Sequence, residues 1–167
     1  MNDAALARAN DGNTDFSLKK MAFSPEISAK VQSGSVRLVI VPFDPQPVID
    51  HQELAAVGLS IEDTPALMST VRLAFRIGLI GRDIAPIQQG NAFELLQELP
   101  PQKLARFGTG RVKHLDIARF ADLGPHDWQA CGYATKVEFQ TYWAQCLPNT
   151  PAETNPWCWL IQFEFKG

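Results

Sequence analysis

Apolar and polar positions are most regularly arranged between Gly132 and Phe165, where a helical pattern is followed by a strand pattern. Thr135 and Glu138 have the spacing of a capping box, in which each side chain bonds a free amide at a helix start. The apolar residues that follow predict a helix over Lys136 to Leu147, with one buried stripe of Phe139, Tyr142, Trp143, Cys146 and Leu147. From Trp157 to Phe165 every second residue is large and apolar, which predicts a strand. Its first half is apolar on both faces, so we expect it inside a sheet that a helix covers.

The chain opens with a polar segment, Met1 to Lys20, that has no regular apolar period. Such a segment buries too little surface to offset its ordering entropy, so we expect a mobile arm followed by one domain over residues 21–167. Ser24 before a proline predicts a helix start, and Gly34 predicts the end of that helix. The β-branched run from Val36 to Val41 predicts a strand.

The pattern between Val71 and Leu79 is ambiguous. Its odd positions are apolar, which favours a strand. A helix that starts at Thr64, with Pro65 in its first turn, fits the same residues and remains an alternative.

Two further signals lie in the second half of the chain. Asn91 and Glu94 repeat the capping-box spacing and predict a helix that ends near Leu99. The glycine-rich stretch FGTGR, residues 107–111, predicts a turn ahead of a strand over Val112 to Phe120.

Three stretches resemble ASCH domains, particularly the small forms found in phages and prophages. MAFSPEISAKVQSG is similar to the family's opening strand and helix, and DIARFADLGPHDWQACGY to its strand and short helix leading into Gly-Tyr. GYATKVEFQTYW and NPWCWLIQFEF are similar to its closing helix and strand. The resemblance implies an α+β fold, a small mixed β-barrel of the PUA-like kind with helices packed around it. It also implies relatives that act as small hydrolases on acylated cytidine nucleosides or as ribonucleases.

The residues that mark the active members of the family follow the first helix, where a glycine is followed closely by a lysine and then by polar positions. In this chain Gly34 is present, but Val36 occupies the lysine position, and the polar positions are Val39, Ile40 and Val41. Cys131 stands where the resemblance places an acid. Because the apolar side chains have no proton to transfer, we assign no catalytic residue. No two histidine or cysteine ligands stand at i, i+3 or i, i+4 on a predicted helix, so we expect no metal, and we expect no cofactor.

Histidines adjoin carboxylates at several places, including His114 with Asp116 and His126 with Asp127. Linear spacing does not bring a nucleophile to any of these pairs. Surface histidines are therefore favoured over a rebuilt catalytic site.

The composition is that of one globular domain, with 46% hydrophobic and 20% charged residues and a net charge of −3. No apolar run approaches the roughly 20 residues of a membrane span, so we expect a cytoplasmic protein without a membrane partner. Cys131, Cys146 and Cys158 have no CxxC spacing and are predicted to be reduced core residues.

Charge is segregated along the chain. Asp44 to Asp63 contains five acids and no Lys or Arg, whereas Lys103 to Arg119 contains five basic residues and one acid. We therefore interpret the chain as a non-catalytic or weakly active ASCH-like domain that binds single-stranded RNA or a nucleotide. The predicted ligand-binding residues are Gly34, Ser35, Arg37, Arg111, Lys113, Arg119 and Tyr133.

Within this set the basic residues are expected to contact phosphate, and Tyr133 either stacks on a base or covers the barrel end. The main alternative is a phage-derived module that binds a host protein through the acidic stretch or the N-terminal arm. A small hydrolase or ribonuclease is the third interpretation.

Overall fold

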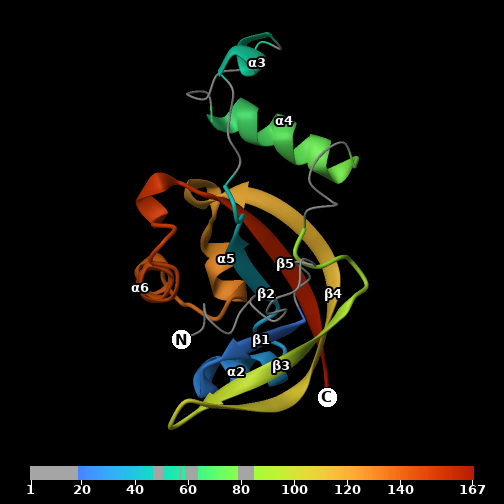
Figure 1. The fold of residues 1–167 in the computed structure, drawn as a ribbon, viewed down its shortest axis with the longest axis vertical. Coiled ribbons are helices and arrows are strands. Elements are labelled where there is room, and N and C mark those ends of the chain that lie inside the picture. The colour runs from blue at the N-terminus through green and yellow to red at the C-terminus, as the bar shows by residue number, and fades with distance from the viewer. Residues whose placement is uncertain (1–18, 47–50, 57, 59–63, 79–84) are drawn as a thin grey trace.

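The computed structural model describes residues 19–46, 51–56, 58, 64–78 and 85–167. Within them the chain is an α+β protein built on one five-stranded sheet (Figure 1). No helix among these residues is long and apolar enough to cross a membrane. The elements in chain order are β1 (Lys20–Phe23), α2 (Pro25–Gln32), β2 (Leu38–Pro42), α3 (His51–Ala56), α4 (Thr64–Arg76), β3 (Ala92–Leu99), β4 (Lys103–Arg119), η2 (Phe120–Asp122), α5 (Pro125–Ala130), α6 (Lys136–Cys146), η3 (Ala152–Thr154) and β5 (Trp157–Lys166).

The strands lie in the order β1-β3-β4-β5-β2, with β1 parallel to β3 and the other neighbours antiparallel. The first part of β4 pairs with β3 and its later part with β5, so this one long strand joins both halves of the sheet. Register shifts after Leu95 and Val112 mark bulges, which bend strands and increase their twist. The sheet therefore curls into a half-barrel (Figure 1), in agreement with the small mixed barrel expected from the sequence.

Both faces of the sheet are covered near its centre. Trp159 and Ile161 face the inner core, which also contains Met21 of β1 and Phe75 of α4. Cys158 and Leu160, which alternate with them, face a second core beneath α5 and α6. This arrangement confirms the prediction that β5 begins buried on both faces, whereas Gln162 and Glu164 at its end are exposed.

The helix starts predicted at the two ends of the chain are confirmed. The Ser24 side chain accepts a hydrogen bond from the amide of Ile27 at the start of α2, and Gly34 after this helix has a positive φ of 84°. Thr135 and Glu138 form the expected capping box at the start of α6. These helix starts could be predicted because each cap depends on two residues only three positions apart in the sequence.

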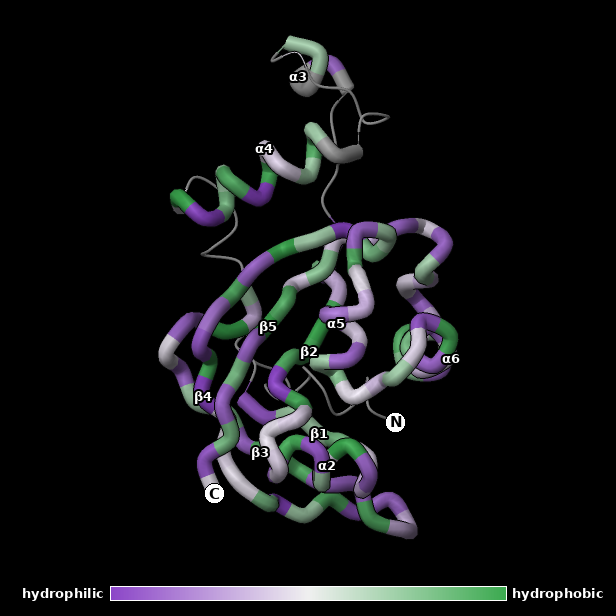
Figure 2. Tube along the Cα trace, turned by 180° about the vertical axis from the view of Figure 1, so that it is seen from behind, coloured by the Kyte–Doolittle hydropathy of each residue, from purple (hydrophilic) through white to green (hydrophobic). Residues whose placement is uncertain are grey.

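The strand favoured over Val71 to Leu79 is wrong, since the described part of this stretch lies in and just after α4. The helical alternative, starting at Thr64, is the observed one. Met68 and Phe75 are buried and Val71 packs partly against the core, whereas Leu73 and Ile77 are exposed. Figure 2 shows the resulting alternation of hydrophobic and hydrophilic residues along α4.

The helix predicted from Asn91 to Leu99 is also wrong, because residues 92–99 form β3. Phe93 and Leu95 are buried in the inner core, and Leu96, which lies on the opposite face of β3, is buried as well. Because β3 is buried on both faces at Leu95 and Leu96, two adjacent apolar residues break the apolar-polar alternation, and the sequence pattern imitates that of a helix.

The turn predicted at residues 107–111 is instead the middle of β4. The ring of Phe165 lies where a Cβ on Gly108 would lie, and the ring of Phe93 lies where one on Gly110 would lie. The glycines thus provide space for aromatic side chains of the neighbouring strands.

Lys19 and Lys20, assigned to the arm from the sequence, lie at the sheet. The Lys19 carbonyl accepts a hydrogen bond of 2.9 Å from the amide of Glu94, and Lys20 begins β1. The other residues of the predicted arm, 1–18, lie outside the described part of the chain.

Candidate functional site

A polar hollow of about 190 Å³ opens on the face of the sheet that α5 covers, and we call it the α5 groove. The residues that line it come from β2 and the residue before it, and from β4, β5 and α5: Arg37, Leu38, His114, Asp116, His126, Asp127, Ala130, Leu160 and Gln162. The register of the sheet explains this grouping, because Leu38 and His114 lie opposite Gln162 on its two sides. The amide of Arg37 also donates to the carbonyl of Ala130 over 3.0 Å, which fixes the entry of β2 against the end of α5.

Three groups in the groove are available to a ligand. The side chains of Arg37, His114 and His126 are exposed, and none makes a hydrogen bond or ion pair with another described residue. A guanidinium and two imidazoles provide donors, and a guanidinium forms bidentate bonds with phosphate or carboxylate.

The two carboxylates of the groove, in contrast, already have partners. Asp116 accepts a hydrogen bond of 2.8 Å from Arg76 and lies 3.6 Å from Nε of Arg72, both on α4. Asp127 accepts a bond of 2.8 Å from the amide of Gly124 and so caps α5. The charge of Asp116 is thus offset by two arginines, whereas Asp127 keeps its charge and directs one oxygen to the start of its own helix. The donors left for an anion are Arg37, His114 and His126.

The sequence places these histidines beside carboxylates but favours surface histidines over a catalytic site built from them. His114 and Asp116 do share one face of β4, as their alternation indicated, and His126 and Asp127 come from α5. Sequence reasoning did not identify Gln162 as a residue of this groove, or Arg72 and Arg76 as the partners of Asp116. The alternation of polar residues at the end of β5 was a signal for Gln162, whereas the strand interpretation of residues 71–79 hid the two arginines.

Of the predicted ligand-binding residues, Arg37 lies in the α5 groove, and the others lie elsewhere. Gly34 and Ser35 form the exposed turn after α2, where the Ser35 hydroxyl donates to the carbonyl of Lys30 over 3.2 Å. They lie next to Arg37 in the chain but do not line the groove.

Arg111 and Lys113 are exposed near the β4 bulge. Arg111 donates to the carbonyl of Gly90 over 2.6 Å, and Lys113 lies near Glu164. The pKa of Glu164 is lowered by a hydrogen bond from Lys166 and by the charges of Lys166 and Lys113. These cations are therefore partly neutralised by the protein itself.

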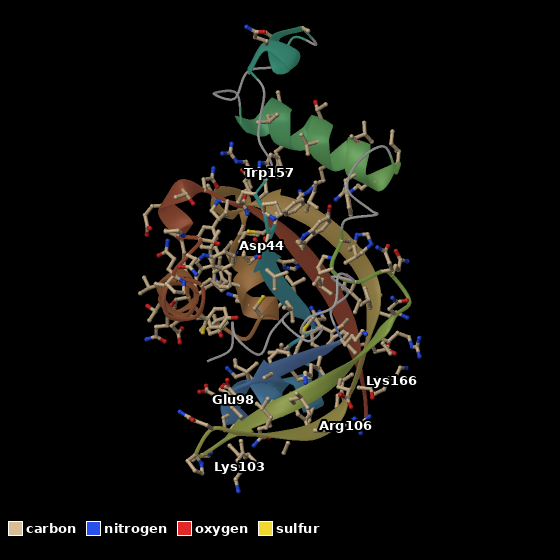
Figure 3. The ribbon with its side chains drawn as sticks, in the orientation of Figure 1. Asp44, Glu98, Lys103, Arg106, Trp157 and Lys166 are labelled. Carbon is tan, nitrogen blue, oxygen red and sulfur yellow. The ribbon has the colours of Figure 1, made fainter. Side chains whose placement is uncertain are left out.

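Arg119 is at the other end of the basic stretch and faces Trp157 across the sheet. Its guanidinium carbon lies 5.6 Å from the centre of the Trp157 ring, as in a cation–π pair. Figure 3 shows Trp157 near α4, at the opposite end of the sheet from Arg106 and Lys166. The basic residues expected to act together are thus distributed along β4.

Tyr133 is half-buried between the two cores, where its ring stacks on that of Tyr142 with centroids 5.0 Å apart. Burial is the main cause that raises the pKa of its phenol, and nearby thiols and carboxylates add to the effect. The Tyr133 ring is thus packed among aromatic neighbours, and it lies outside the α5 groove.

Comparisons with protein-family models, with curated proteins and with solved structures found no match.

Proposed function

We propose that the chain is a non-catalytic ASCH-like domain that binds RNA or a nucleotide through a phosphate in the α5 groove. Support for the kinship is the order of elements at both ends of the domain: a short strand, a helix ending at Ser33-Gly34, and a closing helix and strand around a curled sheet. The PUA-like assignment rests on this order and on the sequence resemblance.

The observation that carries the binding proposal is the convergence of Arg37, His114 and His126 without partners among the described residues. The volume of about 190 Å³ is below that of most small-molecule sites, which enclose roughly 300 Å³ or more. It suits one phosphate group, with sugar and base lying along the rim.

Catalysis of the family's kind has no support at the marker positions. Val36, at the expected lysine position, is buried in the inner core. Cys131, at the expected acid position, is buried too, and burial raises the pKa of its thiol. Neither side chain offers a group that exchanges protons near neutral pH.

The test is fluorescence anisotropy with a labelled single-stranded RNA at several salt concentrations. Binding should weaken with salt, with a slope of about −0.7 for each phosphate contacted. Arg37→Gln should weaken binding about tenfold, whereas Lys103→Gln, at an exposed site on the far end of β4, should have little effect. Equal effects of both variants, or no binding, would contradict the proposal.

One observation favours a second function, a weak ribonuclease or hydrolase. His114 and His126 enter the same groove, and two imidazoles can act as general acid and base. The same RNA, and separately an acylated cytidine, should be incubated with protein and analysed for products. We expect no turnover; turnover that His114→Ala and His126→Ala both abolish would establish the enzyme instead.

The alternative of a host-protein binding module was based on the N-terminal arm and the acidic stretch from Asp44 to Asp63. Most of these residues lie outside the described part of the chain, so no contact or surface of theirs bears on it.

A further inference from the structure

A second and larger hollow lies between α2 and α6, and we call it the α6 groove. Its volume of about 530 Å³ is within the range of small-molecule sites. Tyr133 and Tyr142 form part of its wall, stacked on each other at an interplanar angle of 27°. The groove therefore combines sufficient volume with an aromatic surface.

Charge in the α6 groove is predominantly negative. Three carboxylates line it, Glu26, Glu98 and Glu138, against one cation, Lys30. The Lys30 ammonium lies 3.6 Å from Glu26 and donates to the carbonyl of Gly132 over 3.0 Å, so it offsets one carboxylate and leaves the groove with an excess of negative charge.

The three carboxylates come from different elements, and one of them caps a helix. Glu138 completes the capping box of α6 and is fixed by the amide of Thr135 over 3.1 Å. Glu26 comes from α2, and Glu98, labelled in Figure 3, comes from β3, which contacts α2. The charges of Glu26 and Glu98 contribute, after burial and the neighbouring thiols, to the raised pKa of the Tyr133 phenol. The negative charges of Glu26 and Glu98 therefore act on the Tyr133 side of the groove.

We propose that the α6 groove binds a ligand that carries a primary alkylammonium group, with its methylene chain on the tyrosine rings and its charge near Glu26 and Glu98. Aromatic faces and carboxylates both attract a cation, whereas they disfavour a phosphate. The site is independent of the α5 groove, because the two have no lining residue in common. Free polyamines and lysine side chains share this chemistry.

The test is isothermal titration calorimetry of the full chain at low salt with three probes: spermidine, N-acetyl-lysine methylamide and a neutral diol of similar length. Spermidine should bind and the diol should not. Binding of the lysine derivative as well would show that one ammonium on an aliphatic chain suffices, and its failure would identify a free polyamine as the source.

Variants separate the groove from general attraction to an acidic protein. The double variant Glu26→Gln/Glu98→Gln should weaken spermidine binding at least tenfold, and Tyr142→Leu should weaken it several-fold. Glu153→Gln, at an exposed acid in η3, is the matched control and should have no effect. Thermal melts of each variant would verify that the fold is intact.

Three results would overturn the proposal: no heat with spermidine or the lysine derivative at millimolar concentration, equal binding of the diol, or equal weakening by Glu153→Gln and the double variant. If the double variant unfolds, Tyr142→Leu and the diol comparison still decide the outcome.

Discussion

Arg72 donates from Nε to the main-chain carbonyl of Ile117 over 3.0 Å and so joins α4 to the part of β4 that β3 no longer accompanies. The adjacent carboxylate of Asp116 accepts from Arg76 and keeps both arginines at this edge. The helix therefore provides hydrogen-bond donors where a neighbouring strand is missing.

Removal of this contact should destabilise the fold measurably. Arg72→Ala leaves the Ile117 carbonyl without its side-chain donor and removes one of the two arginines beside the largely buried Asp116, at a cost of about 1–3 kcal/mol in the free energy of unfolding. Arg106→Ala is the control, because its ion pair with Glu94 is exposed and is worth about 0–1 kcal/mol. Urea denaturation of both variants measures the difference, and equal losses would show that the Ile117 contact contributes nothing special.

The glycines of β4 lead to a prediction about packing. Gly110→Ala places a methyl group against the ring of Phe93, and the required shift should cost about 1–3 kcal/mol. Gly124→Ala meets no atom within 4 Å and has a negative φ, so its melting temperature should remain within a few degrees of the wild type. If Gly110→Ala melts like the wild type, the Phe93 ring does not lie over this glycine.

Trp143 of α6 is fully buried, and its indole N–H donates to the carbonyl of Thr150 over 2.7 Å. Trp143→Ala should cost about 3–5 kcal/mol through the cavity it leaves. Trp143→Phe keeps most of the buried ring but loses the hydrogen bond, so we expect a smaller cost of about 1–2 kcal/mol. Denaturant unfolding of both variants measures whether Trp143→Ala loses more stability than Trp143→Phe. Equal and small losses would show that Trp143 is exposed.

Stability should also decrease at alkaline pH. Burial raises the pKa of the Cys131 and Cys158 thiols far above their ordinary value of 9.0, so both remain neutral in the folded chain. In the unfolded chain they ionise near that value. The free energy of unfolding is therefore unaffected by these thiols below pH 9 and falls as the pH rises above it, by about 1 kcal/mol per thiol between pH 9 and pH 10.

Urea titrations at pH 8, 9 and 10 measure this dependence. Cys158→Ala removes one of the two thiols and should give a shallower fall than the wild type. A thiol reagent should react with neither cysteine in the folded protein at pH 8, and rapid reaction would contradict the burial on which the prediction rests.

The sequence predicted those elements whose signals are local. The capping box of Thr135 and Glu138 and the alternation in β5 involve residues within a few positions of each other, and both are present in the structure. β3 and the glycines of β4 were misinterpreted because residues far away in the sequence determine their surroundings. Tertiary packing buries both faces of β3 at Leu95 and Leu96, and a ring from β5 fills the space above Gly108.

The individual residues of the candidate site could be predicted from the sequence, but their grouping in space could not. Arg37, His114 and His126 could each be selected from the sequence as polar or basic residues. Their convergence depends on the strand order that puts β5 between β2 and β4, and on the bond from Arg37 to Ala130. Neither the strand order nor this hydrogen bond can be recognised from the spacing of residues along the sequence.

The position of β2 also determines the order in which the chain can fold. Among the described strands β2 pairs only with β5, more than a hundred residues further along the chain. During synthesis Val39, Ile40 and Val41 must therefore stay without their partner until β5 has left the ribosome. Contacts between residues so far apart in the sequence slow folding, and an unpaired apolar strand is prone to aggregation with other chains. Nascent chains of this protein should consequently depend on a chaperone until β5 is available.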